Sequence, residues 1–198
     1  MEKFITHGGI AAPLYRANIN TDVIIPIKRL LGTERDGLGR YAFEPWRYYD
    51  DGLENPEFIL NQADYRNASI LIGGPNFGCG SSREGAVWAL ADFGFRCVIA
   101  PSFGDIFYGN CLQSGLLPVV LPEDQVRRLI AGSNIFDIDL EARLVIPKGT
   151  APLPFKIDDA GRMKLMQGLD NLGMTLRRGG EISEFQNRDR QARPWIYE

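Results

Sequence analysis

The chain has 198 residues, of which 44% are hydrophobic and 24% are charged, and its formal net charge is −3. This length and composition predict one globular domain. The acidic balance excludes the basic surface of a nucleic-acid-binding protein, and no stretch approaches the ~20 apolar residues of a membrane span. The single histidine, His7, excludes most histidine-based mechanisms, and Cys79, Cys97 and Cys111 contain no C-x-x-C pair. We therefore expect a cytoplasmic protein with free thiols.

The first clear pattern along the chain is an alternation of buried strands and helices in its middle. A glycine-rich loop at 73–80 follows the first strand, and Ser81-Ser82-Arg83-Glu84 matches an S-x-x-E capping box at the start of a helix. Such an alternation predicts parallel strands joined by right-handed crossovers, with the ligand site in the loops at their carboxyl ends. The predicted strands are 68–72, 97–100 and 116–121, and the predicted helices follow Ser81 and span 103–113.

The C-terminal part of the chain changes to shorter alternating segments. A short helix after Pro122 is predicted to end near Ala131, and a last helix to run from about Asp159 to Leu172. Residues 1–176 would form the domain, and residues 177–198 a polar tail that is flexible or docked on a partner. Between the two helices, antiparallel strands are predicted at 136–140, 144–146 and 155–157.

The glycine-rich loop offers backbone amides to an anion, and its other residues limit the kind of anion. A P-loop is excluded because no lysine precedes the serines, and the dinucleotide pattern fails because Arg83 stands where glycine is required. A hydrolase elbow fails because Glu84 occupies the position of its last glycine. The hydroxyls of Ser81 and Ser82 beside the planar guanidinium of Arg83 suit a carboxylate. The alternative is that Ser81 only caps the helix while Arg83 and Glu84 are solvated.

Longer motifs carry a resemblance to a known family. Residues 76–84, Asn-Phe-Gly-Cys-Gly-Ser-Ser-Arg-Glu, resemble the signature loop in the swivelling domain of aconitase-type hydro-lyases. Further segments are similar to the small-subunit family of bacterial 3-isopropylmalate dehydratases, and the resemblance extends from about residue 4 to 176. These segments are 18–26, 88–95, 99–107, 115–118 and 168–173.

This resemblance implies a fold, a reaction and a partner. The fold would be of the α/β class, an aconitase-type swivelling β/β/α domain with a parallel βαβαβ core plus additional antiparallel strands. The reaction would convert 2-isopropylmalate to 3-isopropylmalate by dehydration and rehydration in leucine biosynthesis. The partner would be a large subunit that holds a 4Fe-4S cluster, so this chain would bind no cofactor and no metal itself. The substrate would be a small dicarboxylic hydroxy acid.

The same resemblance assigns roles in the signature loop. Ser81 matches the catalytic serine that removes a proton beside a substrate carboxylate. Arg83 matches the residue that binds this carboxylate, and Ser82 is expected to bind substrate as well. Gly78 and Gly80 would let the backbone approach the substrate closely.

Other segments are assigned supporting roles. Asn20, Thr21 and Asp22 are expected beside the site, together with Glu84; for the first three, the alternative is an ordinary loop in which Asp22 caps a turn. Three basic side chains fall in or beside the segment 32–39, where relatives carry a mobile loop that senses the variable group of the substrate. These candidates are Lys28, Arg29 and Arg35, and an ordinary surface loop is the alternative for them.

Two departures from the family pattern leave the substrate open. Bacterial isopropylmalate enzymes usually continue the signature as Glu-His-Ala-Pro, whereas this chain has Gly85 in place of the histidine. The usual lysine after Ile-Ile-Pro is Ile27 here. A related hydratase for citramalate (citraconate) or dimethylmalate is therefore a second hypothesis, and a non-catalytic dicarboxylate-binding module is a third.

Overall fold

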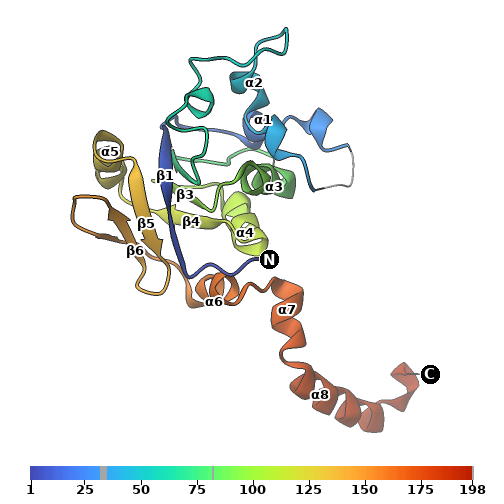
Figure 1. The fold of residues 1–198 in the computed structure, drawn as a ribbon. Helices are drawn as coiled ribbons and strands as arrows, with labels where there is room; N and C mark the ends of the chain where they lie inside the picture. The colour runs from blue at the N-terminus through green and yellow to red at the C-terminus, as the bar shows by residue number, and fades with distance from the viewer. Residues whose placement is uncertain (32–34, 82, 198) are drawn as a thin grey trace.

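A computed structural model describes residues 1–31, 35–81 and 83–197. Within them, strands form one curled seven-stranded sheet in the order β4-β3-β2-β1-β5-β6-β7 (Figure 1). The neighbours from β1 to β4 are parallel, whereas β5, β6 and β7 join on antiparallel. The fold therefore has the predicted α/β class, with a parallel core and an antiparallel extension. The bounds are β1 Thr6–Leu14, β2 Ile70–Gly73, β3 Cys97–Ala100, β4 Leu117–Val120, β5 Ile135–Asp139, β6 Leu144–Pro147 and β7 Leu153–Pro154.

Helices pack on both faces of the sheet and create two hydrophobic cores. Leu71 and Val98 point into one core with α3 and α4, whereas Ile70 and Cys97 point into the other with α5 and α6. This alternation is the period of two expected for strands that are buried on both faces. The helices are α1 Thr21–Ile24, α2 Glu44–Arg47, α3 Glu84–Phe93, α4 Asp105–Ser114, α5 Glu123–Ala131, α6 Asp159–Gln167, α7 Asn171–Leu176 and α8 Gly179–Ala192, with short 3-10 turns at Ile27–Arg29, Gly39–Tyr41, Ile59–Asn61 and Pro194–Ile196.

The start of α3 differs from the prediction. The predicted capping box is wrong, because α3 begins at Glu84 with Arg83 in an extended conformation at the cap position and no side-chain cap. Ser81 is instead part of the preceding loop, where its carbonyl oxygen accepts a hydrogen bond from the Thr21 hydroxyl. This tertiary contact replaces the local capping that the sequence pattern suggested.

The C-terminal elements also correct two expectations. The third antiparallel strand is wrong in position: β7 lies at Leu153–Pro154, while Lys156 makes an isolated bridge to Val120 beside it. The single helix predicted for 159–172 is divided into α6 and α7, because Gly168 ends α6 in the left-handed conformation with a φ of 68°. Asp170 then caps α7 by accepting a hydrogen bond from the Gly173 amide at 2.7 Å.

Strand β1 is the central strand of the sheet, although no strand was predicted there. Its segment contains Gly8, Gly9 and Pro13, which are uncommon inside strands. The glycines are needed because neighbouring side chains lie across them. A Cβ atom at Gly9 would overlap the Ser69 hydroxyl, and one at Gly8 would lie 2.5 Å from Asp137 Oδ1.

The protonation of His7 on β1 makes the free energy of unfolding depend on pH. Its Nε2 lies 2.7 Å from Ser69 Oγ, and burial and the nearby Arg96 lower its pKa, opposed in part by Glu2 and Asp137. The unfolded chain then takes up a proton at a higher pH than the folded chain does. The stability that His7 contributes is therefore fully present above the unfolded pKa of about 6.5 and is lost as the pH falls toward the lower pKa of the folded chain.

We expect His7→Gln to reduce this acid sensitivity. Urea unfolding between pH 7.5 and pH 5 measures it, because the variant lacks the titrating ring. The free energy of unfolding should fall less steeply with acidification in the variant than in the parent chain. Identical pH slopes would show that His7 does not carry the effect.

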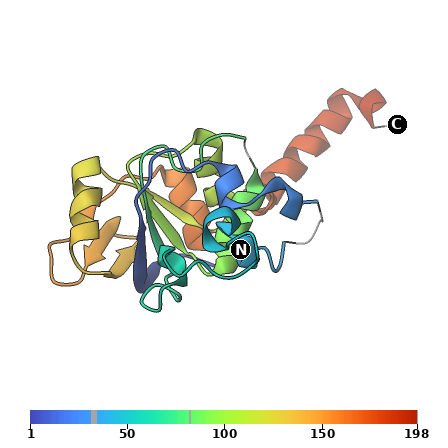
Figure 2. The same cartoon turned by 90° about the horizontal axis from the view of Figure 1, so that it is seen from above.

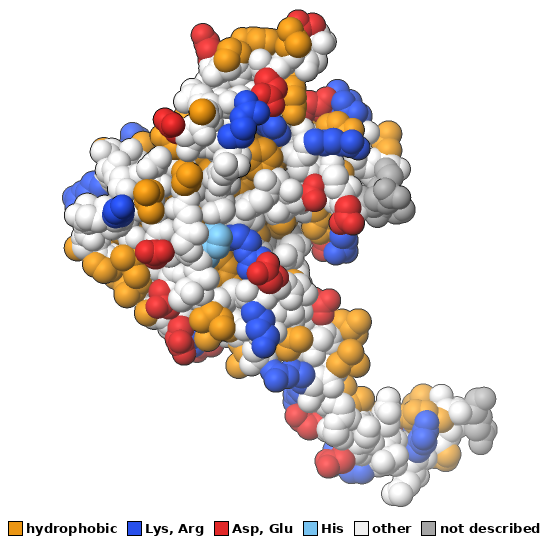
Figure 3. All heavy atoms as spheres, viewed as in Figure 1, with side chains coloured by type: hydrophobic (Ala, Val, Ile, Leu, Met, Phe, Trp, Pro, Cys, Tyr) orange, Lys and Arg blue, Asp and Glu red, His pale blue; other side chains and the backbone are white. Residues whose placement is uncertain are grey.

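The residues expected to form a polar tail include a regular helix. α7 and α8 extend away from the sheet as an arm (Figures 1 and 2), and the described residues of α8 are exposed or half-buried. In Figure 3 the arm shows apolar side chains between charged ones. Among the residues that the structure describes, no helix has the length and apolar character needed to cross a bilayer.

Candidate active site

The glycine-rich loop follows β2 at the carboxyl edge of the parallel strands. A bridge between Asn20 and Cys79 joins it to the segment after β1, and a bridge between Phe77 and Phe103 joins it to the segment after β3. Three consecutive parallel strands therefore continue into three loops that hold one another. This is the edge at which open α/β sheets bind ligands.

Two glycines make the path of this loop possible. Gly78 is buried with a φ of 71°, and a Cβ atom there would overlap the ring of Phe107. Gly104 is also confined, since its Cβ atom would lie 2.8 Å from the carbonyl oxygen of Gly78. Gly80 has a φ of 90° but is exposed, with Asn20 Cβ at 3.4 Å as its nearest neighbour. Gly78 is thus required by packing and conformation, and Gly80 by conformation.

Side-chain amides and a hydroxyl fix the beginning of the loop. Asn76 donates from Nδ2 to Asn18 Oδ1 at 2.8 Å, and its backbone amide donates to Ser102 Oγ at 2.8 Å. Asn18 and Asn76 both have a φ near 57°, a conformation that asparagine tolerates better than most residues. Both residues lie within the family-like sequence motifs, which indicated no role for them.

The segment Asn20–Asp22 holds the loop next to Ser81. Thr21 is buried, its amide donates to the Cys79 carbonyl at 3.0 Å, and its hydroxyl donates to the Ser81 carbonyl at 2.5 Å. Asn20 caps α1, since its Oδ1 accepts from the Val23 amide at 2.9 Å. The Ser81 residue itself is exposed. The backbone of Ser81 is therefore fixed while its side chain faces solvent.

Arg83 lies at the start of α3 and is paired with Asp22. Its Nη1 atom is 2.5 Å from Asp22 Oδ1, and the Arg83 side chain is 21% exposed against 53% for Asp22. A guanidinium carries five N–H donors, so this single contact orients Arg83 and leaves donors for a second carboxylate. Glu84 follows on the surface in the first turn of α3, where the helix dipole favours a carboxylate. Ser82 lies outside the described residues.

The basic candidates of the proposed substrate loop separate into two groups. Arg29 binds Glu44 with two hydrogen bonds of 2.8 and 2.9 Å, and Lys28 lies 3.2 Å from the same carboxylate. These contacts, the Arg29 bonds foremost, lower the pKa of Glu44. Arg35 instead stacks on Trp88 of α3, 4.1 Å from the ring centre. Only Arg35 therefore contacts the helix that begins at the site, and residues 32–34 between the groups lie outside the described residues.

The Leu30 side chain packs against α3 at Gly85. A Cβ atom there would lie 2.5 Å from Leu30 Cδ2, so the Leu30 side chain occupies the space that a larger residue would need. Further along α3, the Gly39 amide donates to Asp92 Oδ2 at 2.7 Å. Leu30, Arg35 and Gly39 thus each contact α3. In the sequence, the glycine in place of the usual histidine at position 85 was the one indication of the contact between Leu30 and α3.

The cysteines do not fit an iron-sulfur cluster. Cys97 and Cys111 are fully buried, and burial raises the pKa of both thiols, so they stay protonated. Cys79 is half-buried in the glycine-rich loop. In the described ranges, no group of three or more His, Cys, Asp or Glu side chains could hold a metal ion. A 4Fe-4S cluster needs several thiolates at one place, which these residues do not provide.

Comparisons with known proteins show which chains resemble this one. Residues 1–124 match the aconitase C-terminal domain family. The chain is 50% identical over 201 aligned residues to the 3-isopropylmalate dehydratase small subunit of Rhodospirillum centenum, covering 98% of both chains. It is 48% identical to that of Parvibaculum lavamentivorans, covering 99% of this chain and 100% of the other.

A solved structure shows the same fold. The structure of 3-isopropylmalate dehydratase from Methanocaldococcus jannaschii superposes with a TM-score of 0.69 at 24% identity, and covers 91% of this chain and 99% of that one. The aconitase-type fold expected from the sequence is thereby confirmed. Together with the full-length sequence matches, this shows that the chain belongs to the 3-isopropylmalate dehydratase small-subunit family of aconitase-type proteins.

Proposed function

We propose that this chain is the small subunit of a hydro-lyase that isomerises 2-isopropylmalate to 3-isopropylmalate in leucine biosynthesis, and that it is active only with a large subunit. Its relatives carry the small-subunit name over their full length. The observation that carries the proposal is that an exposed Ser81, whose carbonyl Thr21 binds, lies two residues before Arg83, which Asp22 orients.

In the proposed reaction, Arg83 and Ser81 have different roles. Arg83 binds a substrate carboxylate with its free donors, and Ser81 removes the proton from the carbon beside that carboxylate. The C–H electron pair then forms the double bond as the neighbouring carbon loses its hydroxyl as hydroxide, for which the large subunit would supply the acceptor. A serine is a weak base in water, so its ionised form needs nearby positive charge, which Arg83 and the N-terminus of α3 supply. Rehydration returns a proton to the carbon skeleton from the same side chain.

We place the 4Fe-4S cluster in the large subunit, because the cysteines of this chain do not fit one. The large subunit would then complete the site from the side of the carboxyl edge. A cytoplasmic location accords with three free thiols, since disulfides are uncommon in that compartment.

Co-expression with the large-subunit gene of the same genome tests the proposal. The reconstituted complex is assayed anaerobically by the ultraviolet absorbance of the unsaturated intermediate, with isopropylmalate, citramalate and dimethylmalate. The highest kcat/KM is expected for isopropylmalate. A higher value for another acid would favour the related hydratase, a possibility raised by Leu30 filling the space at Gly85. Binding without turnover of any substrate would favour the non-catalytic module.

We further propose that the C-terminal arm docks on the large subunit. Leu176, Phe185 and Trp195 are 67%, 55% and 67% exposed, a large apolar surface for a segment outside the core. The relatives named as small subunits match 98–99% of this chain, so the alignments include the arm. In this family, the large subunit is the partner that could cover these apolar side chains.

Deletion of residues 177–198 should weaken the complex at least tenfold and leave the domain folded. Size-exclusion chromatography and thermal unfolding of the small subunit measure the two effects. Phe185→Ala should weaken assembly more than the neighbouring Glu184→Ala, because apolar anchors dominate interface energies. Unchanged assembly after the deletion would remove the arm from the interface.

A further inference from the structure

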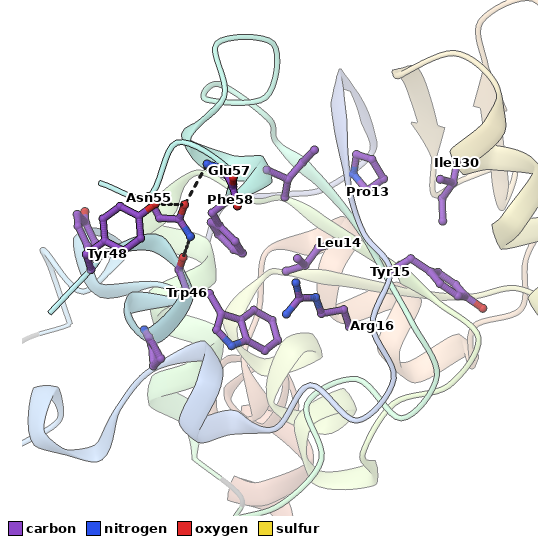
Figure 4. Close-up of a pocket in the computed structure, with 13 residues that line it drawn as sticks. Pro13, Leu14, Tyr15, Arg16, Trp46, Tyr48, Asn55, Glu57, Phe58 and Ile130 are labelled. Carbon is purple, nitrogen blue, oxygen red and sulfur yellow. Dashed lines mark hydrogen bonds between the residues drawn. The ribbon is translucent and has the colours of Figure 1, made fainter. Parts of the chain in front are cut away.

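A cavity lies at the carboxyl end of β1, one strand away from the strand that the glycine-rich loop follows. It measures about 620 Å³, within the usual range of small-molecule sites of about 300–1,000 Å³. Leu14, Trp46 and Phe58 form much of its apolar wall, and Ile59 and Ile130 extend it (Figure 4). Its lining residues do not include Ser81, Arg83 or the segment 20–22. The cavity is therefore a separate feature of the same sheet edge.

Arg16 carries the positive charge of this cavity. Figure 4 shows its side chain between Leu14 and Trp46, and its guanidinium carbon is 4.7 Å from the centre of the Trp46 ring. Within the described part of the chain, no carboxylate lies within 4 Å of this guanidinium, whereas Arg29 and Arg83 are both paired. An arginine held by an aromatic ring keeps its planar donors available for an anion.

Hydrogen bonds hold the walls on both sides of Arg16. Asn55 donates to the Trp46 carbonyl at 3.3 Å, and its Oδ1 accepts from the Tyr49 hydroxyl at 3.1 Å and the Glu57 amide at 3.0 Å. On the other side, the Tyr15 hydroxyl donates to Glu123 at 2.9 Å. The aromatic wall therefore exists before a ligand arrives, which reduces the entropy cost of binding.

The charge balance of the cavity limits the kind of anion. Among its lining residues, Arg16 is the one Lys or Arg and Glu57 the one Asp or Glu. A dianion would meet the Glu57 carboxylate as well as the arginine, whereas a monoanion can pair with Arg16 and place its apolar body on the Trp46 and Phe58 wall. We propose that this cavity binds a monocarboxylate with a branched-alkyl or aryl body, distinct from the dicarboxylate bound at the glycine-rich loop.

Titration of the full-length small subunit with phenylacetate and 4-methylpentanoate, followed by calorimetry, tests this site. Saturable binding is expected, at least tenfold weaker in Arg16→Gln and at least tenfold weaker for the neutral phenylacetamide. Arg127→Gln is the matched control, because Arg127 also stacks on an aromatic ring, that of Tyr15 at 4.7 Å, but is paired with Glu123. Its affinity for phenylacetate should not change.

Ser81→Ala separates this site from the catalytic loop and should leave phenylacetate binding unchanged. Arg16 is exposed, so the Gln variant should fold, which thermal unfolding verifies. The proposal is overturned by absence of saturable binding, by equal affinity in Arg16→Gln, by equal affinity for phenylacetamide or by tighter binding of malate. Displacement of phenylacetate by the large subunit would instead make the cavity a protein interface and would also overturn it.

Discussion

Replacement of Ser81 by alanine is expected to lower kcat of the reconstituted enzyme by about 10²–10⁴-fold, the usual contribution of general acid-base catalysis. The substitution removes the hydroxyl proposed to take the substrate proton. It leaves the loop intact, because Thr21 binds the backbone carbonyl of Ser81 and not its side chain. Formation of the unsaturated intermediate under saturating substrate measures the loss.

Ser102→Ala is the comparison for Ser81→Ala. The Ser102 hydroxyl accepts a hydrogen bond from the Asn76 amide and therefore supports the same loop without being assigned chemistry. Its loss should cost about 0.5–1.5 kcal/mol of stability and less than tenfold in kcat. A Ser81→Ala enzyme that retained more than a tenth of the parent kcat, with normal assembly, would contradict the assignment of the base.

Gly78→Ala is expected to be the most destabilising single methyl addition in the site. The new Cβ would overlap the Phe107 ring, which is 2% exposed and packs edge-on against Phe77 at 5.5 Å. The φ of 71° adds a conformational cost of about 1–2 kcal/mol, and overpacking adds about 1–3 kcal/mol. We therefore expect a loss of about 2–5 kcal/mol in the free energy of unfolding, measured in urea.

Gly109→Ala provides the control for this glycine. Gly109 lies in α4, close in sequence to Phe107, and a Cβ atom there would meet nothing within 4 Å. Alanine in a helix is favoured over glycine by about 1 kcal/mol, so this variant should be neutral or more stable. If both variants shifted stability equally, the steric conflict at Gly78 would not be the cause.

Much of the parallel half was predictable because its signals are local. The strands ending near Ile72, Ala100 and Val120 are short apolar runs, and each is followed by a turn or helix signal. These local patterns also placed the glycine-rich loop at the carboxyl edge. The roles proposed for Ser81 and Arg83 came from the family resemblance, because their spacing alone favoured a helix cap with solvated charges.

The parts that could not be predicted depend on contacts distant in sequence. The strand character of β1 comes from pairing on both sides, while Gly8 and Gly9 read locally as a turn. The Thr21 hydroxyl that displaces the capping box is 60 positions from Ser81. Lys28 and Arg29 were candidates for a substrate loop, but Glu44, 15 or more positions away, binds both in the folded chain.

The place of β1 in the sheet has a consequence for synthesis on the ribosome. The first strand to emerge pairs Ala11 with Ile70 on one side and Thr6 with Asp139 on the other. The partner strands of its two edges are thus synthesised at very different times. The edge that pairs with β5 has no partner until most of the chain has been made. Open strand edges promote association between nascent chains, and pairing over such separations is slow. We expect the yield of folded protein to depend on chaperone supply more than on the final stability of the sheet.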